Sequence, residues 1–129
     1  MTAILQSLNR LLLLRLIAMA ALMAAPATAA DLVGRYRCVG SNPNGGQYQA
    51  NIVIERSGDG YRLTWTIGDA VHHGIAIRTG NVLASSWSPG RNQHGIVSYR
   101  IGRRGNLRGL WAQYPDVSRL FTEDCEPTR

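Results

Sequence analysis

The sequence contains no lysine: all 14 of its basic residues are arginine, against 8 acidic residues. A GC-rich coding sequence is the simplest explanation for this bias. The 129 residues also include two cysteines and one phenylalanine. Two distant cysteines exclude the closely spaced pairs of zinc sites and redox motifs. A lone phenylalanine leaves the tryptophans and tyrosines to supply most of the aromatic bulk of any core.

Motifs for catalysis, metal binding and phosphate binding are also absent. Ser85, Ser86 and Ser98 belong to no nucleophile elbow of the G-x-S-x-G kind, and no glycine-rich loop opens a helix after a strand. The carboxylates are scattered and form no close pair suited to acid–base chemistry. His72 and His73 are adjacent, so on a strand they point to opposite faces and do not share an ion. We therefore predict no catalytic residues, no metal and no cofactor.

Residues 1–29 have the three parts of a bacterial signal peptide. Arg10 and Arg15 form a basic region, an uncharged run follows at 16–25, and Ala27-Thr28-Ala29 supplies small residues for cleavage. A membrane anchor is the alternative, but spanning a bilayer takes about 20 apolar residues, and Arg15 interrupts any such run. We predict a cleaved signal and no membrane span afterwards. The mature chain, periplasmic or secreted, would keep 12 arginines against 8 acidic residues, a net charge of +4.

The mature chain, residues 30–129, has the size of one domain. Its cysteines, Cys38 and Cys125, lie near the two ends of that domain. In an exported protein such a pair usually forms a disulfide. A loop of this length contributes about 4 to 5 kcal/mol in the chain-entropy model. We predict the Cys38–Cys125 bond in a monomeric single domain.

Apolar and polar residues alternate with period two along the mature chain, and glycine, asparagine and aspartate separate the runs. Each run predicts an antiparallel strand with one apolar face. In the fourth run we take Val71, His73, Ile75 and Ile77 as the apolar, inward series. Short hairpins in succession favour an all-β, eight-stranded antiparallel up-and-down barrel, whose closure removes exposed edges; a two-sheet sandwich is the alternative. The predicted strands are 32–40, 47–56, 60–68, 71–78, 81–87, 95–101, 106–113 and 117–124.

Three runs share a faint repeat, in which a turn glycine precedes a strand that ends in Trp65, Trp87 or Trp111. One interpretation is a set of tryptophans around a ligand cavity. The other is core filling, because the interior of an eight-stranded barrel is just wide enough for its own side chains. We favour core filling.

Arginines are the surface feature that suggests a partner. Arg62 and Arg100 alternate with apolar residues and are expected to face solvent, and an anionic-ligand patch would comprise Arg62, Arg100, Arg103, Arg104 and Arg108. Such a patch suits an anionic glycan, although a solvated outer face is the simpler interpretation. Nucleic acid is not expected, because the aromatic residues face inward and the protein is exported.

Four segments, NPNGGQY at 42–48, VIERSGDGYRLTW at 53–65, IGDAVHHGIAIRTGNVL at 67–83 and GIVSYRIGRRGNLRGLW at 95–111, resemble a family of small exported bacterial proteins. Many members carry the label fibronectin-binding protein. The resemblance covers about residues 31–111 and implies a non-enzymatic binding module for an extracellular-matrix protein of the host or for an envelope ligand. The tail departs from the family pattern at Tyr114-Pro115-Asp116 and at Cys125.

A second resemblance gives the alternative function. Tyr36-Arg37-Cys38-Val39-Gly40 with a late cysteine is similar to the opening of periplasmic lysozyme inhibitors. It implies an inhibitor of lysozyme or another hydrolase, with residues 84–90 as the loop that enters the enzyme's cleft. A separate candidate binding loop, Asn42, Pro43, Asn44 and Gly45, is first a hairpin turn and second a surface that faces a partner.

Overall fold

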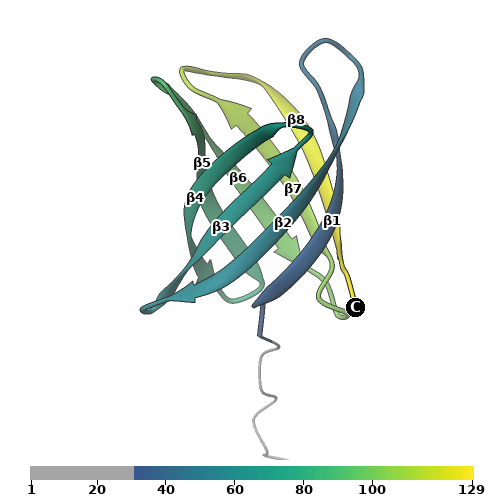
Figure 1. Ribbon diagram of the computed structural model, residues 1–129, viewed down its shortest axis with the longest axis vertical. Helices are drawn as coiled ribbons and strands as arrows, with labels where there is room; N and C mark the ends of the chain where they lie inside the picture. Colours follow the sequence, from purple (N-terminus) through teal and green to yellow (C-terminus); the bar gives the residue numbers. More distant parts are fainter. Residues whose placement is uncertain (1–30) are drawn as a thin grey trace, which may run out of the picture. The chain divides into compact units, whose positions relative to one another are not determined.

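The computed structural model describes residues 31–129 as eight strands without a helix (Figure 1). The predicted signal peptide, 1–29, lies outside the described residues. Within the described part, no helix is long and apolar enough to cross a membrane. The strands are β1 (Gly34–Ser41), β2 (Gln47–Ser57), β3 (Gly60–Ile67), β4 (Ala70–Thr79), β5 (Val82–Gly90), β6 (Gln93–Ile101), β7 (Leu107–Gln113) and β8 (Asp116–Pro127).

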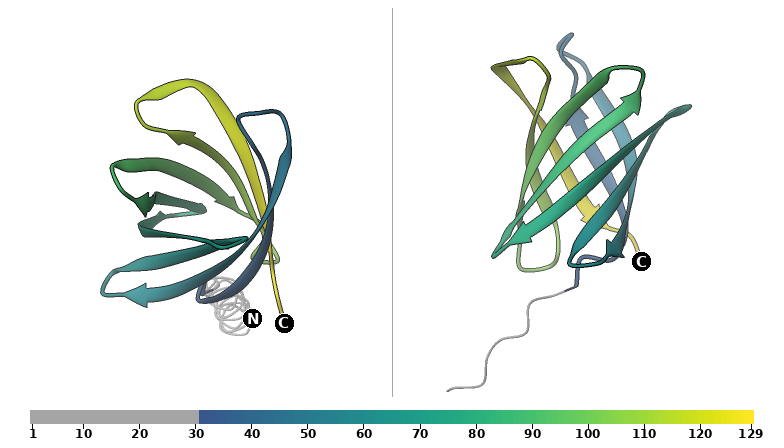
Figure 2. Two further views of the ribbon diagram at one scale, coloured as in Figure 1. Left: turned by 45° about the horizontal axis from the view of Figure 1, so that its top comes forward. Right: turned by 90° about the vertical axis from the view of Figure 1, so that its left-hand side faces the viewer.

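Each strand pairs with its sequence neighbours in antiparallel fashion, and β1 also pairs with β8, so the sheet closes into a barrel. Figure 2 shows β1 and β8 side by side. The predicted up-and-down barrel is therefore confirmed, and the two-sheet sandwich is wrong. Closure leaves the described strands without a free edge, which is how barrels avoid edge-to-edge aggregation.

The disulfide joins the first and last strands. Cys38 lies directly opposite Cys125 in the β1–β8 register, and the two sulfurs are bonded. Both side chains are fully buried inside the barrel. The predicted bond is confirmed. Because disulfides persist in oxidising surroundings, it indicates a compartment other than a reducing cytoplasm.

Alternation places one face of each strand inside the barrel, as expected for β2, β3 and β6. In β4 the prediction is wrong: Ile75 and Ile77 are 73% and 67% exposed, whereas Gly74 and Ala76 face the interior. The physical reason is space. A Cβ on Gly74 would collide with the carbonyl oxygen of Ser86 on the neighbouring strand, so the interior accepts only the smaller series.

The two ends of the barrel differ. The turns β1–β2, β3–β4, β5–β6 and β7–β8 lie at one end, the upper end in Figure 1. Toward the opposite end, aliphatic side chains fill the interior, and Tyr36 donates a 2.8 Å hydrogen bond to the carbonyl oxygen of Leu32, whose side chain is fully buried. The fully buried aliphatic residues are Leu32, Ile52, Ile54, Leu63, Leu83 and Leu107.

Candidate functional site

A cavity of about 210 Å³ occupies the upper end of the barrel. Asn42 from the β1–β2 turn and Ile67 and Ala70 beside the β3–β4 turn line its mouth. Aromatic side chains make most of its wall, and one carboxylate, that of Glu123, lies among them. The lining consists of Asn42, Tyr48, Trp65, Ile67, Ala70, His72, Trp87, Val97, Tyr99, Trp111 and Glu123.

Glu123 on β8 is the polar centre of this cavity. Its side chain is only 3% exposed, and an isolated carboxylate in that position would be costly. Three donors satisfy it: the Tyr48 hydroxyl bonds Oε2 at 2.6 Å, Trp65 Nε1 bonds Oε1 at 3.0 Å, and the Tyr99 hydroxyl also bonds Oε1. The donors come from β2, β3 and β6, so only the closed barrel assembles them.

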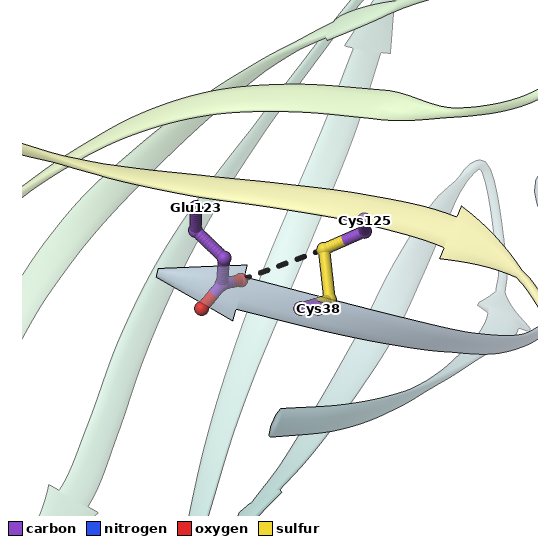
Figure 3. Close-up of side chains that lie close together, drawn as sticks. All are labelled: Cys38, Glu123 and Cys125. Carbon is purple, nitrogen blue, oxygen red and sulfur yellow. Dashed lines mark hydrogen bonds between the residues drawn. A yellow bond between two sulfur atoms is a disulfide. The ribbon is translucent and has the colours of Figure 1, made fainter. Parts of the chain in front are cut away.

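The strand register explains why Glu123 points inward. Residues two apart on a strand share a face, and Cys125 faces the interior to reach Cys38. Figure 3 shows Glu123 and the disulfide together inside the barrel, with Cys125 Sγ 3.9 Å from Glu123 Oε1. These three residues are close enough to share a metal ion in principle. However, sulfurs in a disulfide are not thiolates, so the cluster is not a metal site.

The environment sets the protonation of the aromatic donors. Burial, reinforced by the Glu123 carboxylate, raises the pKa of Tyr48 and Tyr99 well above the ordinary value. Both hydroxyls therefore stay protonated and keep donating at neutral pH. Burial lowers the pKa of His72, against a smaller opposing effect of Glu123, so its imidazole is neutral at pH 7.

The wall of the cavity is built of rings at steep angles to each other. Trp87 and Trp111 meet edge to face, with centroids 5.7 Å apart at 85°, and Tyr48 meets Trp111 at 6.3 Å and 69°. His72 stacks on Trp87 at 5.6 Å and 18°. Gly95, opposite Trp87 in the register, makes room for that indole, because a Cβ there would collide with the ring.

Trp87 also carries an unsatisfied group. Its side chain is 8% exposed, and Nε1 is buried without a hydrogen-bond partner in the described part of the chain. Trp65 and Trp87 thus both pack in the barrel interior as core filling predicts, and both also line the cavity with Trp111. The two interpretations of the tryptophans are not exclusive.

The candidate binding loop lies at the mouth of this cavity. Asn42 and Gly45 close the turn through a 3.0 Å backbone bond from Gly45 N to the Asn42 carbonyl, and the Asn44 side chain accepts a bond from Gly46 N. Pro43 accepts a 3.2 Å bond from Arg119 Nη2 of β8. Asn42 alone of the four predicted residues lines the cavity. A role of the loop in binding stays a prediction.

The five predicted arginines are all exposed, but they do not form one patch. Arg100 on β6 and Arg108 on β7 are direct cross-strand partners, and Arg103 and Arg104 lie in the turn between them, at the end opposite to the cavity. Arg62 lies apart on β3, between Glu55 and Ile75 in the register. We call the four neighbouring residues the β6–β7 arginine group.

The loop expected to enter a lysozyme cleft is a strand. Residues 84–90 belong to β5, with Ser85 and Trp87 buried, and Arg91 and Asn92 form the turn that follows. Ser88 Oγ donates to the carbonyl of Gln93 and accepts from Gly90 N, which ties the end of β5 to β6. This segment does not project as a loop.

Reasoning from sequence missed Glu123, the centre of the cavity, and the tyrosines that hold it. The signal was present: Glu123 precedes Cys125 by two residues, and two residues apart on a strand share a face. Once Cys125 is predicted to be inside, Glu123 must be inside as well, and a buried carboxylate needs partners.

Comparisons with known proteins support the barrel fold but identify no family. No family model matches the chain, and no curated protein matches it. Among solved structures, the chain is similar to one described as REP1-NXSQ fatty acid transporter, with a TM-score of 0.51 over 78% of this chain and 98% of that chain. The two sequences are 12% identical, so the likeness shows a shared barrel fold. The resemblance to the fibronectin-binding family stays a prediction.

Proposed function

We propose that the protein is an exported, non-enzymatic binding module that holds a small envelope ligand in the cavity at the upper end of the barrel. The observation that carries the proposal is the buried Glu123, held by three donors at an aromatic-walled cavity. Concave sites with apolar walls and a few fixed polar groups are typical of small-molecule binding. The disulfide and the predicted signal peptide support export.

The cavity contrasts with the other half of the interior. Protein interiors are packed as densely as organic crystals, with few voids larger than a water molecule, and in the other half of this barrel fully buried aliphatic side chains occupy the interior. Large aromatic residues surround the cavity without filling it. A filled core would have placed a further aliphatic side chain there, so the open space supports a ligand.

The volume limits the ligand. Sites for drug-sized molecules are about 300 to 1,000 Å³, and benzene binds in an engineered cavity of about 150 Å³. At about 210 Å³, this cavity suits one ring or a short branched chain. A longer molecule would extend through the mouth.

A small ligand ranks above the two protein partners considered from sequence. Fibronectin-type recognition by strand addition needs an open sheet edge, and the described strands have none. The lysozyme-inhibitor interpretation needs a projecting loop at 84–90, which here is strand. The fatty acid transporter with a similar fold is itself named as a carrier of a small molecule, which is compatible with our proposal.

Tryptophan fluorescence provides the test, because all three tryptophans line the cavity. We expect at least one member of a panel of benzyl alcohol, benzylamine and octanoate to change the emission and raise the melting temperature. Ala70→Trp, at the mouth, should weaken that binding about tenfold by occupying the entrance. Val71→Trp is the matched control, because the neighbouring side chain points outward and is 45% exposed.

Two results would contradict the proposal. One is a panel that changes neither emission nor melting temperature. The other is binding that Ala70→Trp and Val71→Trp leave equally strong, because the ligand would then lie outside the cavity.

A further inference from the structure

We propose that the cavity selects an organic cation: an ammonium group on a small apolar body. This inference rests on the proposed function and names the class of its ligand. It follows from the charge of the lining, from an acceptor that the protein leaves open, and from the arrangement of the rings.

The first observation is that the cavity lining, among the described residues, holds a carboxylate but no positively charged side chain to pair with it. Glu123 is the one acidic residue of the lining, and no arginine belongs to that lining in the part of the chain that the structure describes. Tyr48, Trp65 and Tyr99 are neutral donors, so they stabilise the carboxylate by hydrogen bonds and leave its charge in place. His72 is neutral at pH 7, because burial lowers its pKa. The cavity is therefore negative.

The second observation is an open position on Glu123. Oε1 accepts bonds from both Trp65 and Tyr99, whereas Oε2 accepts one bond, from Tyr48. A carboxylate offers about four lone-pair sites. Oε2 therefore keeps an acceptor position, which a ligand N–H can occupy and to which a quaternary ammonium is attracted by charge alone.

The third observation is the set of rings. The face of an aromatic ring attracts cations, with indole the strongest. Trp87 and Trp111 stand at 85° to each other, and Tyr48 stands at 69° to Trp111. Because the edge of an aromatic ring is positive, only ring faces attract a cation, and Tyr48, Trp87 and Trp111 all line the space in which it would lie. Trp65 and Tyr99 complete the wall next to Glu123.

An anionic ligand fits the same site poorly. The carboxylate of a fatty acid would meet Glu123, and like charges in a partly buried site repel. No arginine of the described residues lines the cavity: Arg119, next to its mouth, donates to the Pro43 carbonyl oxygen, and the β6–β7 arginine group lies at the opposite end of the barrel. We therefore expect this chain to discriminate by ligand charge, against fatty acid anions.

The experiment uses three probes of nearly the same shape: choline, the neutral 3,3-dimethylbutan-1-ol and the anionic 3,3-dimethylbutanoate. Titrations of the full mature protein at pH 7.5 are followed by tryptophan emission and calorimetry. We expect choline to bind at least about tenfold more tightly than the alcohol, and the anion to bind most weakly. If the alcohol or the anion binds as tightly as choline, the inference is wrong. Binding of any one of the three probes in the cavity is still consistent with the proposed function.

Glu123→Gln tests the origin of the preference. It should lower choline affinity at least about tenfold and change alcohol affinity less than twofold, so that the discrimination is lost. Glu126→Gln is the matched control, because this exposed residue of the same strand β8 lies outside the cavity. If Glu123→Gln does not fold, the comparison of choline, the alcohol and the anion on the wild-type protein still tests the inference. If none of the three probes binds, the cation inference is wrong. The proposed function is then tested separately by the panel of benzyl alcohol, benzylamine and octanoate.

Discussion

At the scale of single residues, two tryptophans of the cavity differ in one hydrogen bond. Trp65 Nε1 donates to Glu123 Oε1 at 3.0 Å and lies 3.3 Å from the Tyr99 hydroxyl oxygen. Trp87 Nε1 is buried without a partner among the described residues. A buried donor without an acceptor costs free energy, whereas a bond to a charged acceptor stabilises the fold by about 1.5 to 3 kcal/mol.

This difference predicts that the two tryptophans contribute unequally to the free energy of unfolding. Trp65→Phe and Trp87→Phe remove a similar ring area, but only the first removes a hydrogen bond to Glu123. We expect Trp65→Phe to lower the free energy of unfolding by about 1 to 2 kcal/mol more than Trp87→Phe does. Urea denaturation followed by circular dichroism measures both. Equal losses would mean that the Trp65–Glu123 bond adds nothing to stability.

At the scale of elements, the β6–β7 hairpin concentrates positive charge. Arg100 and Arg108 are cross-strand partners, and like charges in that position repel. Arg103 and Arg104 add two more exposed charges at the turn. Phosphate or sulfate oxygens would relieve this repulsion, because guanidinium forks match their geometry.

We therefore expect the hairpin to decide retention on heparin. Arg104→Ser should elute at clearly lower salt than the wild-type protein, because it removes one member of a group. Arg62→Ser removes the same charge from a site between Glu55 and Ile75 and should change retention little. Melting temperatures should be unchanged in both. Identical elution of the two variants would show that the arginines are an ordinary solvated surface.

Strand β4 shows that sequence periodicity does not always predict which side chains face the barrel interior. Both of its alternating series are apolar or small, so periodicity alone does not choose between them, and hydrophobicity selects the wrong one. Ile75 and Ile77 lie outside with Ile96, Leu110, Val117 and Leu120, all more than half exposed. Packing selected the other series, because the Ser86 backbone and the Ser85 hydroxyl of β5 leave no room for a Cβ at Gly74.

At the scale of the whole molecule, closure and the disulfide support each other. The bond links residues 87 positions apart, and it spans the one strand pair, β1–β8, that is not formed by sequence neighbours. Bringing β1 and β8 together costs chain entropy, and in the chain-entropy model the bond lowers that cost because it already restricts the unfolded chain.

The double variant Cys38→Ala/Cys125→Ala should therefore lose about 2 to 5 kcal/mol of unfolding free energy, measured by guanidinium denaturation. A reducing agent should lower the melting temperature of the wild-type protein and leave that of the variant unchanged. Thiol titration of the unfolded, non-reduced wild-type chain should detect no free thiol. Two titratable thiols in protein from its own envelope would contradict the bond.

The sequence by itself determined the strands, their order and the disulfide, because alternation, turn residues and the position of two cysteines are local properties of the chain. It also determined that the tryptophans lie inside. Only the tertiary structure decided that Glu123 meets Tyr48, Trp65 and Tyr99, that the upper half of the barrel stays open, and that Arg62 is separated from the β6–β7 arginine group. These features depend on which strands become neighbours around a closed barrel and on the volume left between their side chains, and neither quantity is encoded in any single segment.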